Sequence, residues 1–305
     1  MSLQNLWMLS SVVTPNGTIR QISDQNIAFN LEEVIERGSA AVDPSFIAIM
    51  GGKPMMSFET KAIPSALTVA GLSGLPIEGE PIDFYFQRVA RGSTRDGGNA
   101  IMIRGTTGML IPKTIKADHG SVATAGYDFN AISVDGETNP LEIFRDVDLP
   151  NVGLATEVFT LGPVVINGRV FDGLQGMEFD PSIDAMIEGD QGLPYPTTSG
   201  IGTRTPKFTF SGKEMAIMAS DAFGIEGLPV TSWSAHLRRL ARGSTRFASG
   251  DAEHIRFSGS DGMLKPESAK ANEKKPFDAE YCLYPSINDD DALAVEISTE
   301  ATIDV

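Results

Sequence analysis

Apolar and polar residues alternate along two pairs of segments that lie roughly 150 positions apart. The first pair is 55–60 and 207–211, and the second pair is 82–88 and 233–239. A period of two places alternate side chains on one face of an extended chain. Each segment therefore predicts a β-strand with one buried face.

A segment with helical spacing lies inside each half of the chain. Residues 63–72 and 214–223 carry alanine, leucine or methionine at this spacing. Each segment ends near glycines suitable for a C-cap, Gly71 and Gly74 in the first and Gly224 and Gly227 in the second. Loops at 92–98 and 243–250 precede returning strands at 101–104 and 255–257, and the last strands are expected at 127–134 and 277–284. We expect mostly antiparallel β-structure with one packed α-helix in each half.

The two halves also share sequence in the same order. The segments 89–95 and 240–246 are identical at six of seven positions, including Arg-Gly-Ser-Thr-Arg. Residues 74–77 return at 227–230, and 108–110 with Pro112 return at 262–264 with Pro266. Weaker matches join 29–30 to 179–180 and 141–143 to 295–297. The chain is interpreted as a tandem duplication of one domain.

This repeat predicts the domain boundaries. Residues 27–144 and 177–305 form the two like domains, each of ordinary size, and 145–176 form an ordered but peripheral connector. In the connector, the apolar run 164–166 before Asn167-Gly168 predicts a short hairpin. Residues 1–26 are either an arm that reaches a neighbouring molecule or a first edge strand.

Charge restricts the partners. The 305 residues carry a formal net charge of −16, which argues against a protein that binds nucleic acid by neutralising its phosphates. An acidic surface suits a conduit that must let DNA slide past, and it equally suits plain solubility. Apolar stretches such as 46–50 are far shorter than the roughly 20 residues that cross a bilayer, so we expect no membrane anchor. The first ten residues lack a secretory signal, which predicts assembly in a cytoplasm.

Catalytic chemistry is not indicated. His119, His236 and His254 have no partner at metal-ligand spacing, and His236 is expected on the polar face of a strand. Neither a phosphate-binding loop nor a dinucleotide fingerprint occurs. Cys282, the single cysteine, is expected to be a core or half-buried thiol. We expect no enzyme activity, metal or cofactor.

The repeated Arg-Gly-Ser-Thr-Arg segment supplies the candidate contact residues. Arg91, Arg95, Arg242 and Arg246 flank glycine-bearing turns and could each bind a carboxylate of a neighbouring subunit through two hydrogen bonds. Alternatively, the glycine and hydroxyls only shape a loop and the arginines are solvated. The acidic turns 135–137 and 289–291 are expected to be solvated rather than calcium-binding, because the spacing of a calcium loop is missing.

The chain resembles the tail tube proteins of long-tailed phages. The resemblance lies in 176–180, 192–197 and 204–210, where an early strand leads through a loop to a proline, a second strand and then one helix. It implies two tandem β-sandwich or barrel-like domains, and a double-domain subunit that closes a ring as a homotrimer with pseudo-sixfold symmetry. The rings would stack into a tube in the virion tail, contact other tail proteins, and pass DNA through an acidic lumen without specific binding.

Three other classes stay open. A hydrolase built on a β-sandwich, with paired carboxylates far apart in sequence, ranks last because no convergent residues can be named for it. A capsid-decorating or adhesive β-protein would have the same composition but would not stack. A DNA sliding clamp is also acidic, duplicated and ring-forming, but it needs two basic helices per domain, whereas one helix per half is predicted.

Overall fold

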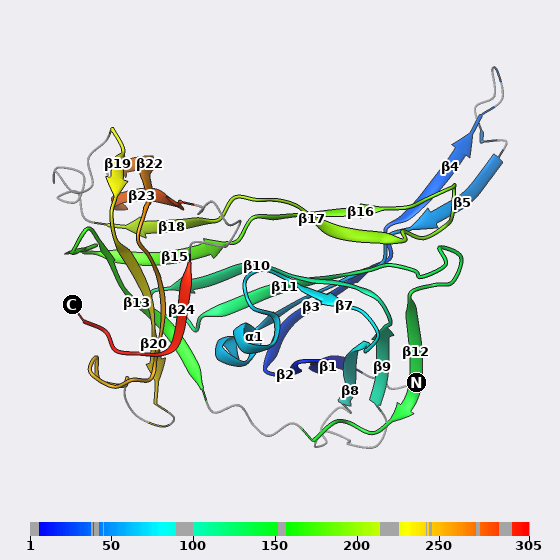
Figure 1. The fold of residues 1–305 in the computed structure, drawn as a ribbon, viewed down its shortest axis with the longest axis horizontal. Helices are drawn as coiled ribbons and strands as arrows, with labels where there is room; N and C mark the ends of the chain where they lie inside the picture. Colours follow the sequence, from blue (N-terminus) through cyan, green and yellow to red (C-terminus); the bar gives the residue numbers. More distant parts are fainter. Residues whose placement is uncertain are drawn as a thin grey trace.

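The computed structural model describes residues 6–37, 39, 43–44, 46–89, 100–151, 157–213, 226–241, 243, 246–272, 275–286 and 295–304. Within these ranges the chain forms 24 β-strands and one α-helix, which confirms the expected mainly β class (Figure 1). No helix in these ranges is long and apolar enough to cross a membrane.

The strands of residues 6–147 enclose the helix α1 (Ile63–Ala70). They are β1 (Leu6–Thr14), β2 (Gly17–Ile19), β3 (Ile22–Ala28), β4 (Leu31–Glu36), β5 (Phe46–Gly52), β6 (Met55–Thr60), β7 (Leu75–Ile77), β8 (Ile82–Val89), β9 (Ala100–Gly105), β10 (Gly108–Asp118), β11 (Thr124–Ala131) and β12 (Leu141–Val147).

The strands of residues 158–301 follow in the same order. They are β13 (Val158–Ile166), β14 (Arg169–Val170), β15 (Leu174–Asp180), β16 (Ile183–Glu188), β17 (Thr198–Arg204), β18 (Lys207–Gly212), β19 (Leu228–Val230), β20 (Trp233–Leu240), β21 (His254–Gly259), β22 (Gly262–Asn272), β23 (Lys275–Pro285) and β24 (Glu296–Ala301).

One long sheet runs through the whole molecule. It has ten strands in the order β19-β22-β23-β18-β15-β10-β11-β6-β3, with β7 paired to β10 beside this path. Two five-stranded sheets, β12-β9-β8-β1-β2 and β14-β13-β20-β21-β24, pack below its two ends (Figure 1). Two separate hairpins, β4–β5 and β16–β17, complete the fold.

The strand pairings of residues 6–147 occur again among residues 158–301. In the five-stranded sheets, β1–β2, β1–β8, β8–β9 and β9–β12 match β13–β14, β13–β20, β20–β21 and β21–β24. In the long sheet, β3–β6, β6–β11, β10–β11 and β7–β10 match β15–β18, β18–β23, β22–β23 and β19–β22. The pairing of β10 with β15 joins the two sets.

Aromatic side chains fill the space between the long sheet and each five-stranded sheet. In the first set, Phe58 of β6 lies 6.1 Å from Phe84 of β8, measured between ring centroids. In the second set, Phe208 of β18 lies 4.7 Å from Trp233 of β20 and 5.8 Å from Phe257 of β21. The buried apolar residues of both sets form one continuous core. Each five-stranded sheet thus packs against the long sheet through aromatic side chains.

A charged pair braces the first five-stranded sheet. Arg104 of β9 donates hydrogen bonds of 2.7 and 2.9 Å to the two carboxylate oxygens of Asp83 on the neighbouring β8. Asp83 is buried, and the bidentate geometry compensates for the loss of its hydration. In the second set, Ser234 and Ser258 are paired at the same place, so the pair belongs to one half only.

The helix and several strands lie where the alternation predicts them. Residues 63–72 were expected to be helical, and α1 ends at Ala70, where Gly71 adopts a φ of 62° and its N–H bonds to the Leu67 carbonyl. The strand predicted at 55–60 coincides with β6, and the expected hairpin of 164–166 around Asn167-Gly168 is formed by β13 and β14. The helix expected at 214–223 lies outside the described residues.

Three expectations differ from the structure. Further strands, β12 and β24, follow the predicted last strands. The connector is not peripheral, because β13 pairs with β20 and buries Phe159, Val164 and Ile166. For residues 1–26 the arm alternative is wrong: their described part forms strands within the body, with β2 and β3 at sheet edges, as in the edge-strand alternative, and β1 paired between β8 and β2.

Candidate functional site: the polar face and the free edges of the long sheet

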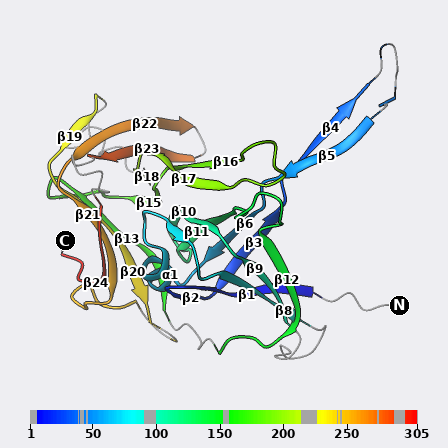
Figure 2. The ribbon, with the colours of Figure 1, turned by 45° about the vertical axis from the view of Figure 1, so that its right-hand side comes forward.

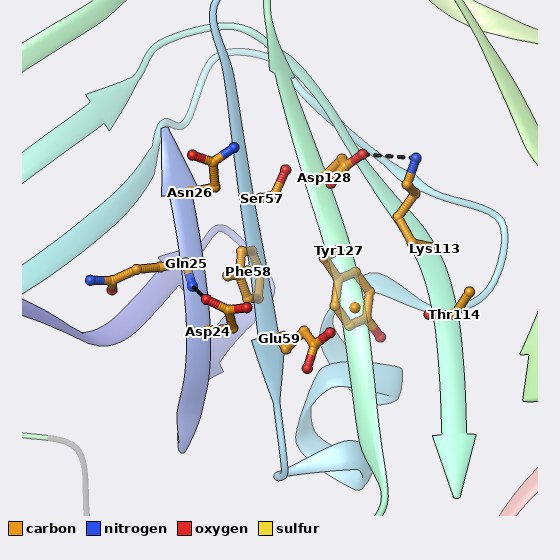
Figure 3. A pocket seen from close by; sticks show the side chains of 11 residues that line it. Asp24, Gln25, Asn26, Ser57, Phe58, Glu59, Lys113, Thr114, Tyr127 and Asp128 are labelled. Carbon is orange, nitrogen blue, oxygen red and sulfur yellow. Dashed lines mark hydrogen bonds and ion pairs between the residues drawn. The ribbon is translucent and has the colours of Figure 1, made fainter. Parts of the chain in front are cut away.

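The long sheet has one apolar and one polar face. In β11, Tyr127 and Phe129 are buried in the core, while Asp128 between them points to the opposite side. Across this polar face, Asp128 pairs with Ser57 of β6, and Ser57 pairs with Asn26 of β3 (Figure 3). These strands line a shallow hollow of about 230 Å³.

Among the described residues of the polar face, carboxylates outnumber lysines by nine to five. Four lysine–carboxylate pairs lie on it, with distances of 3.0 to 3.5 Å. The carboxylates are those of Asp24, Glu59, Asp118, Asp128, Glu178, Asp180, Glu267, Asp278 and Glu280, and the lysines are Lys113, Lys116, Lys207, Lys265 and Lys270. The face is therefore acidic and repels phosphate groups.

The polar face differs between the two halves at one buried position. Cys282 of β23 pairs with Thr209 of β18, as Asp128 of β11 pairs with Ser57 of β6. The thiol is buried, as expected, and desolvation raises its pKa. Its hydrogen bond with Tyr284 raises the pKa of that phenol to about 12. A thiol with a raised pKa is a poor nucleophile, so Cys282 is a packing residue.

The histidines are separated and serve as local structural groups. His236 is buried rather than on an exposed polar face, because Pro163 and its neighbours cover this side of β20. Burial lowers the pKa of His236, and its Nδ1 lies 3.2 Å from the Pro163 carbonyl oxygen. His254 accepts a hydrogen bond from the Arg239 N–H, and its Nε2 faces the Ala248 carbonyl. In the described part of the chain, no group of three His, Cys, Asp or Glu could hold a metal ion.

The acidic turn at 135–137 is held by its own hydrogen bonds. Asp135 accepts hydrogen bonds from the backbone N–H groups of Glu137 and Thr138 and from the hydroxyls of Ser133 and Thr138. These bonds stabilise the charged form and lower the pKa of Asp135. The corresponding turn, 289–291, lies outside the described residues.

Of the four candidate contact arginines, the structure describes one. Arg246 is exposed and forms an isolated backbone bridge with Leu240 at the base of its loop. Arg91, Arg95 and Arg242 lie outside the described residues. Whether the arginines meet a neighbouring subunit stays a prediction.

The junction between the halves is an antiparallel strand pair. On one side of β10, residues 108–110 pair with β7 and residues 115–118 pair with β15. Ile115 pairs with Phe179 and Lys116 pairs with Glu178. Pairing leaves Ile115 2% exposed and Phe179 fully buried. The junction thus combines backbone hydrogen bonds with buried apolar contacts.

Both partners of this junction have a counterpart whose corresponding edge segment pairs with no other strand among the described residues. The counterpart of β10 is β22, whose residues 262–264 pair with β19. Beyond Leu264, no other described strand pairs with this side of β22. The counterpart of β15 is β3, which is the last strand at the other end of the described sheet. The two ends of the long sheet thus present the edges of β22 and β3, which are the counterparts of the strands β10 and β15 that pair at its centre.

The registers define which residues correspond. Both β3–β6 and β15–β18 contain one irregularity, after Ile22 and Leu174 respectively. Beyond it, Ile27 pairs with Met56 as Phe179 pairs with Phe208, so Ile27 is the counterpart of Phe179. In the same way, Ala269 pairs with Ala279 as Ile115 pairs with Ala125. Ala269 is exposed and Ile27 is half-buried, in contrast to their buried counterparts.

Sequence comparison identifies no relative. No protein-family model matches the chain, and no curated protein sequence matches it.

These edges and this face were missed by the residue-level prediction, which singled out only the arginine loops. The alternation Tyr127-Asp128-Phe129-Asn130 was a usable signal for the polar face, because it separates two apolar rings by a carboxylate. The edges had no such signal, since a pairing between distant strands leaves no local pattern.

Proposed function

We propose that this chain is a ring-forming structural subunit of a phage tail tube and that it acts without catalysis. In this proposal the chain is a tandem duplication of one β-sandwich domain, and three copies close a pseudo-sixfold ring. The observation that carries it is the β10–β15 junction, whose two edges recur unpaired at the ends of the same sheet. Because β10 and β15 already pair within the chain, their counterparts β22 and β3 can pair in the same way between two chains.

The duplication is supported by strand pairing as well as sequence. Each pairing within residues 6–147 has a counterpart within 158–301, including the irregularities of β3–β6 and β15–β18. The sequence identities of 89–95 and 240–246 fall at the ends of corresponding strands, β8 and β20. A common origin of the two halves accounts for both observations.

The central junction gives the register between copies. Transferred to the free edges, it pairs Ala269 of one copy with Ile27 of the next, and Lys270 with Asn26. Such pairing would bury the remaining exposed surface of Ile27 and satisfy both rows of free backbone groups. Closure into a ring removes exposed strand edges, which otherwise promote uncontrolled association.

A ring of three has a suitable opening. Each copy contributes eight strands to the continuous sheet, β22, β23, β18, β15, β10, β11, β6 and β3. With a strand spacing of about 4.8 Å and a tilt of about 40°, three copies close a barrel with a backbone diameter of roughly 50 Å. Side chains reduce the opening to roughly 35–40 Å, which admits duplex DNA of about 20 Å diameter. Two copies would leave roughly 20 Å and would be too narrow.

The polar face would line this opening. Its excess of carboxylates would keep DNA from binding to the wall, because a moving polyanion is not held by a surface of like charge. The apolar face is already covered by the five-stranded sheets, so the acidic face is the one that curvature would turn inward. In this role the partners are copies of the chain, other tail proteins and passing DNA, and the location is the virion tail after assembly in the host cytoplasm.

Electron microscopy of negatively stained protein tests the proposal directly. The purified chain is imaged over a series of protein and salt concentrations. We expect annular particles or stacked hollow rods with threefold or pseudo-sixfold end views. Uniform monomers at every concentration would refute the ring and would favour a capsid-decorating or adhesive β-protein.

A further inference from the structure

The two separate hairpins share one register. In β4–β5, Glu32 pairs with Gly51, an irregularity follows, and Val34 pairs with Ala48. In β16–β17, Asp184 pairs with Thr203, an irregularity follows at the same point, and Met186 pairs with Gly200. Ile49 of β5 thus corresponds to Ile201 of β17. The hairpins are counterparts, although they lie in different surroundings.

Hairpin β16–β17 lies on the first half of the molecule. Both strands contact β10, and the segment that connects them is hydrogen-bonded to residues of the first half. Ser133 N–H donates to the Pro196 carbonyl at 2.8 Å, and Gly52 N–H donates to the Pro194 carbonyl at 2.9 Å. Tyr195 N–H donates to the Gly136 carbonyl at 3.0 Å. Gly51 is required here, because a Cβ on it would lie 2.3 Å from the Pro194 carbonyl oxygen.

Hairpin β4–β5 projects from the body, and its two strands extend away from β19 and β22 (Figures 1 and 2). Six of its large apolar residues are exposed, with Ile49 at 65%. The others are Leu31, Ile35, Phe46, Ile47 and Met50, and Phe29 lies just before the hairpin. An apolar group of this size on one projecting element indicates a surface that another molecule covers.

The matching surface is found on the second half of the chain. On the first half, Met109 of β10 is 8% exposed, and its Cε and the Ile201 Cδ1 both lie within 4 Å of the Cβ position of Gly74. The counterpart of Met109 is Met263 of β22, which is 50% exposed. Gly227 occupies the position of Gly74 beside it and has the same positive φ. Among the described residues, no hairpin covers Met263 as β16–β17 covers Met109.

We propose that β4–β5 of one copy lies across β22 of the neighbouring copy and covers Met263, as β16–β17 lies across β10 within the chain. This inference rests on the proposed ring. It agrees with the transferred register, because pairing of β3 with the next copy's β22 brings the hairpin that follows β3 to that copy. The occupant is thus a second copy of this chain, and Ile49 is the residue that meets Met263.

Paired cysteines test this contact in the full-length chain. The variant Ile49→Cys/Met263→Cys is treated with a short bis-maleimide at a concentration at which rings form. We expect covalent dimers and trimers on denaturing gels. The control Ile143→Cys/Met263→Cys places a thiol at a site of similar exposure, 60%, on β12, and should give at least tenfold less product. Met109→Cys/Ile201→Cys should cross-link within the monomer at any concentration.

The outcomes separate the two proposals. Rings in the microscope with no more cross-linking of the Ile49 pair than of the Ile143 pair would overturn the hairpin contact and leave the ring intact. Absence of rings at every concentration would overturn both proposals. Cross-linking of the Ile49 pair together with an assembly concentration raised about tenfold by Ile49→Ser, and unchanged by Ile143→Ser, supports the contact.

Discussion

Replacing Ala269 by glutamate places a charge on the free edge of β22 with little effect on the single chain. Ala269 is exposed, and exposed substitutions of this kind change the free energy of unfolding by less than about 0.5 kcal/mol. Its counterpart Ile115 is 2% exposed at the β10–β15 junction. In a ring built on that junction, a glutamate at position 269 would therefore be buried against Ile27 of the next copy.

The carboxyl group can enter that contact charged or protonated. An unpaired buried charge costs several kcal/mol. At pH 7.5, protonating a carboxyl of ordinary pKa, about 4.3, costs roughly 1.4 kcal/mol per pH unit, or about 4 kcal/mol in total. The cost of protonation is the upper limit of the penalty, because the carboxyl group can always enter the contact in its protonated form. With some relaxation at the edge, we expect each junction to weaken by about 2–4 kcal/mol, which is roughly 30- to 1000-fold in Kd.

Sedimentation velocity across a concentration series measures this effect. Ala252→Glu is the matched control, because Ala252 is also exposed and lies in the turn before β21 instead of on a free edge. Lowering the pH to 5 reduces the protonation cost to about 1 kcal/mol and should restore much of the assembly of the Ala269 variant. Assembly of Ala269→Glu at the wild-type concentration and pH would refute the β22–β3 junction.

Three other predictions concern single groups. Arg104→Ser should lower the free energy of unfolding by about 2–4 kcal/mol, because it leaves the buried Asp83 carboxylate unpaired. In denaturant titrations, the double variant Asp83→Ser/Arg104→Ser should be more stable than Arg104→Ser. Burial lowers the pKa of His236, so the unfolded chain binds a proton more readily than the folded chain. Stability should therefore fall as the pH drops below about 6.5. In thermal melts, the stability of His236→Asn should depend less steeply on pH in this range. Glu59→Lys/Glu178→Lys should make the assembled protein retain duplex DNA at low salt and release it as salt rises, as measured by gel shift.

The strands that carry strict alternation were predictable. Segments such as β6 and β11 each bury one face, so their sequence shows the period directly. The start of the repeat was harder to locate, because β1 and β13 share only three residues, Leu9, Val12 and Val13 of β1 matching Leu161, Val164 and Val165 of β13. The weak match of Phe29 to Phe179 was two positions out of register. The strand pairing makes Ile27 the counterpart, since Ile27 and Phe179 face corresponding residues of β6 and β18.

The candidate site was predictable only in kind. A strand-lined acidic surface was expected from the net charge and the resemblance, and the residues of the polar face fit that description. The free edges depend on which distant strands are neighbours, a property that no local segment encodes. Exposure of Ile49 and Met263 also required the structure, because their counterparts Ile201 and Met109 have the same residue types in covered positions.

The β10–β15 pairing also affects the kinetics of assembly. Because both strands belong to one chain, they meet at an effective concentration in the millimolar range, and this pair forms as the chain folds. A pair between separate chains must wait for a diffusional encounter. Every second contact around a closed ring would then be independent of protein concentration, and a ring of three chains would need two encounters before it closes, where six single domains would need five. Damage to the internal contact would appear as lost folding stability, and damage to the external contact as a higher threshold concentration.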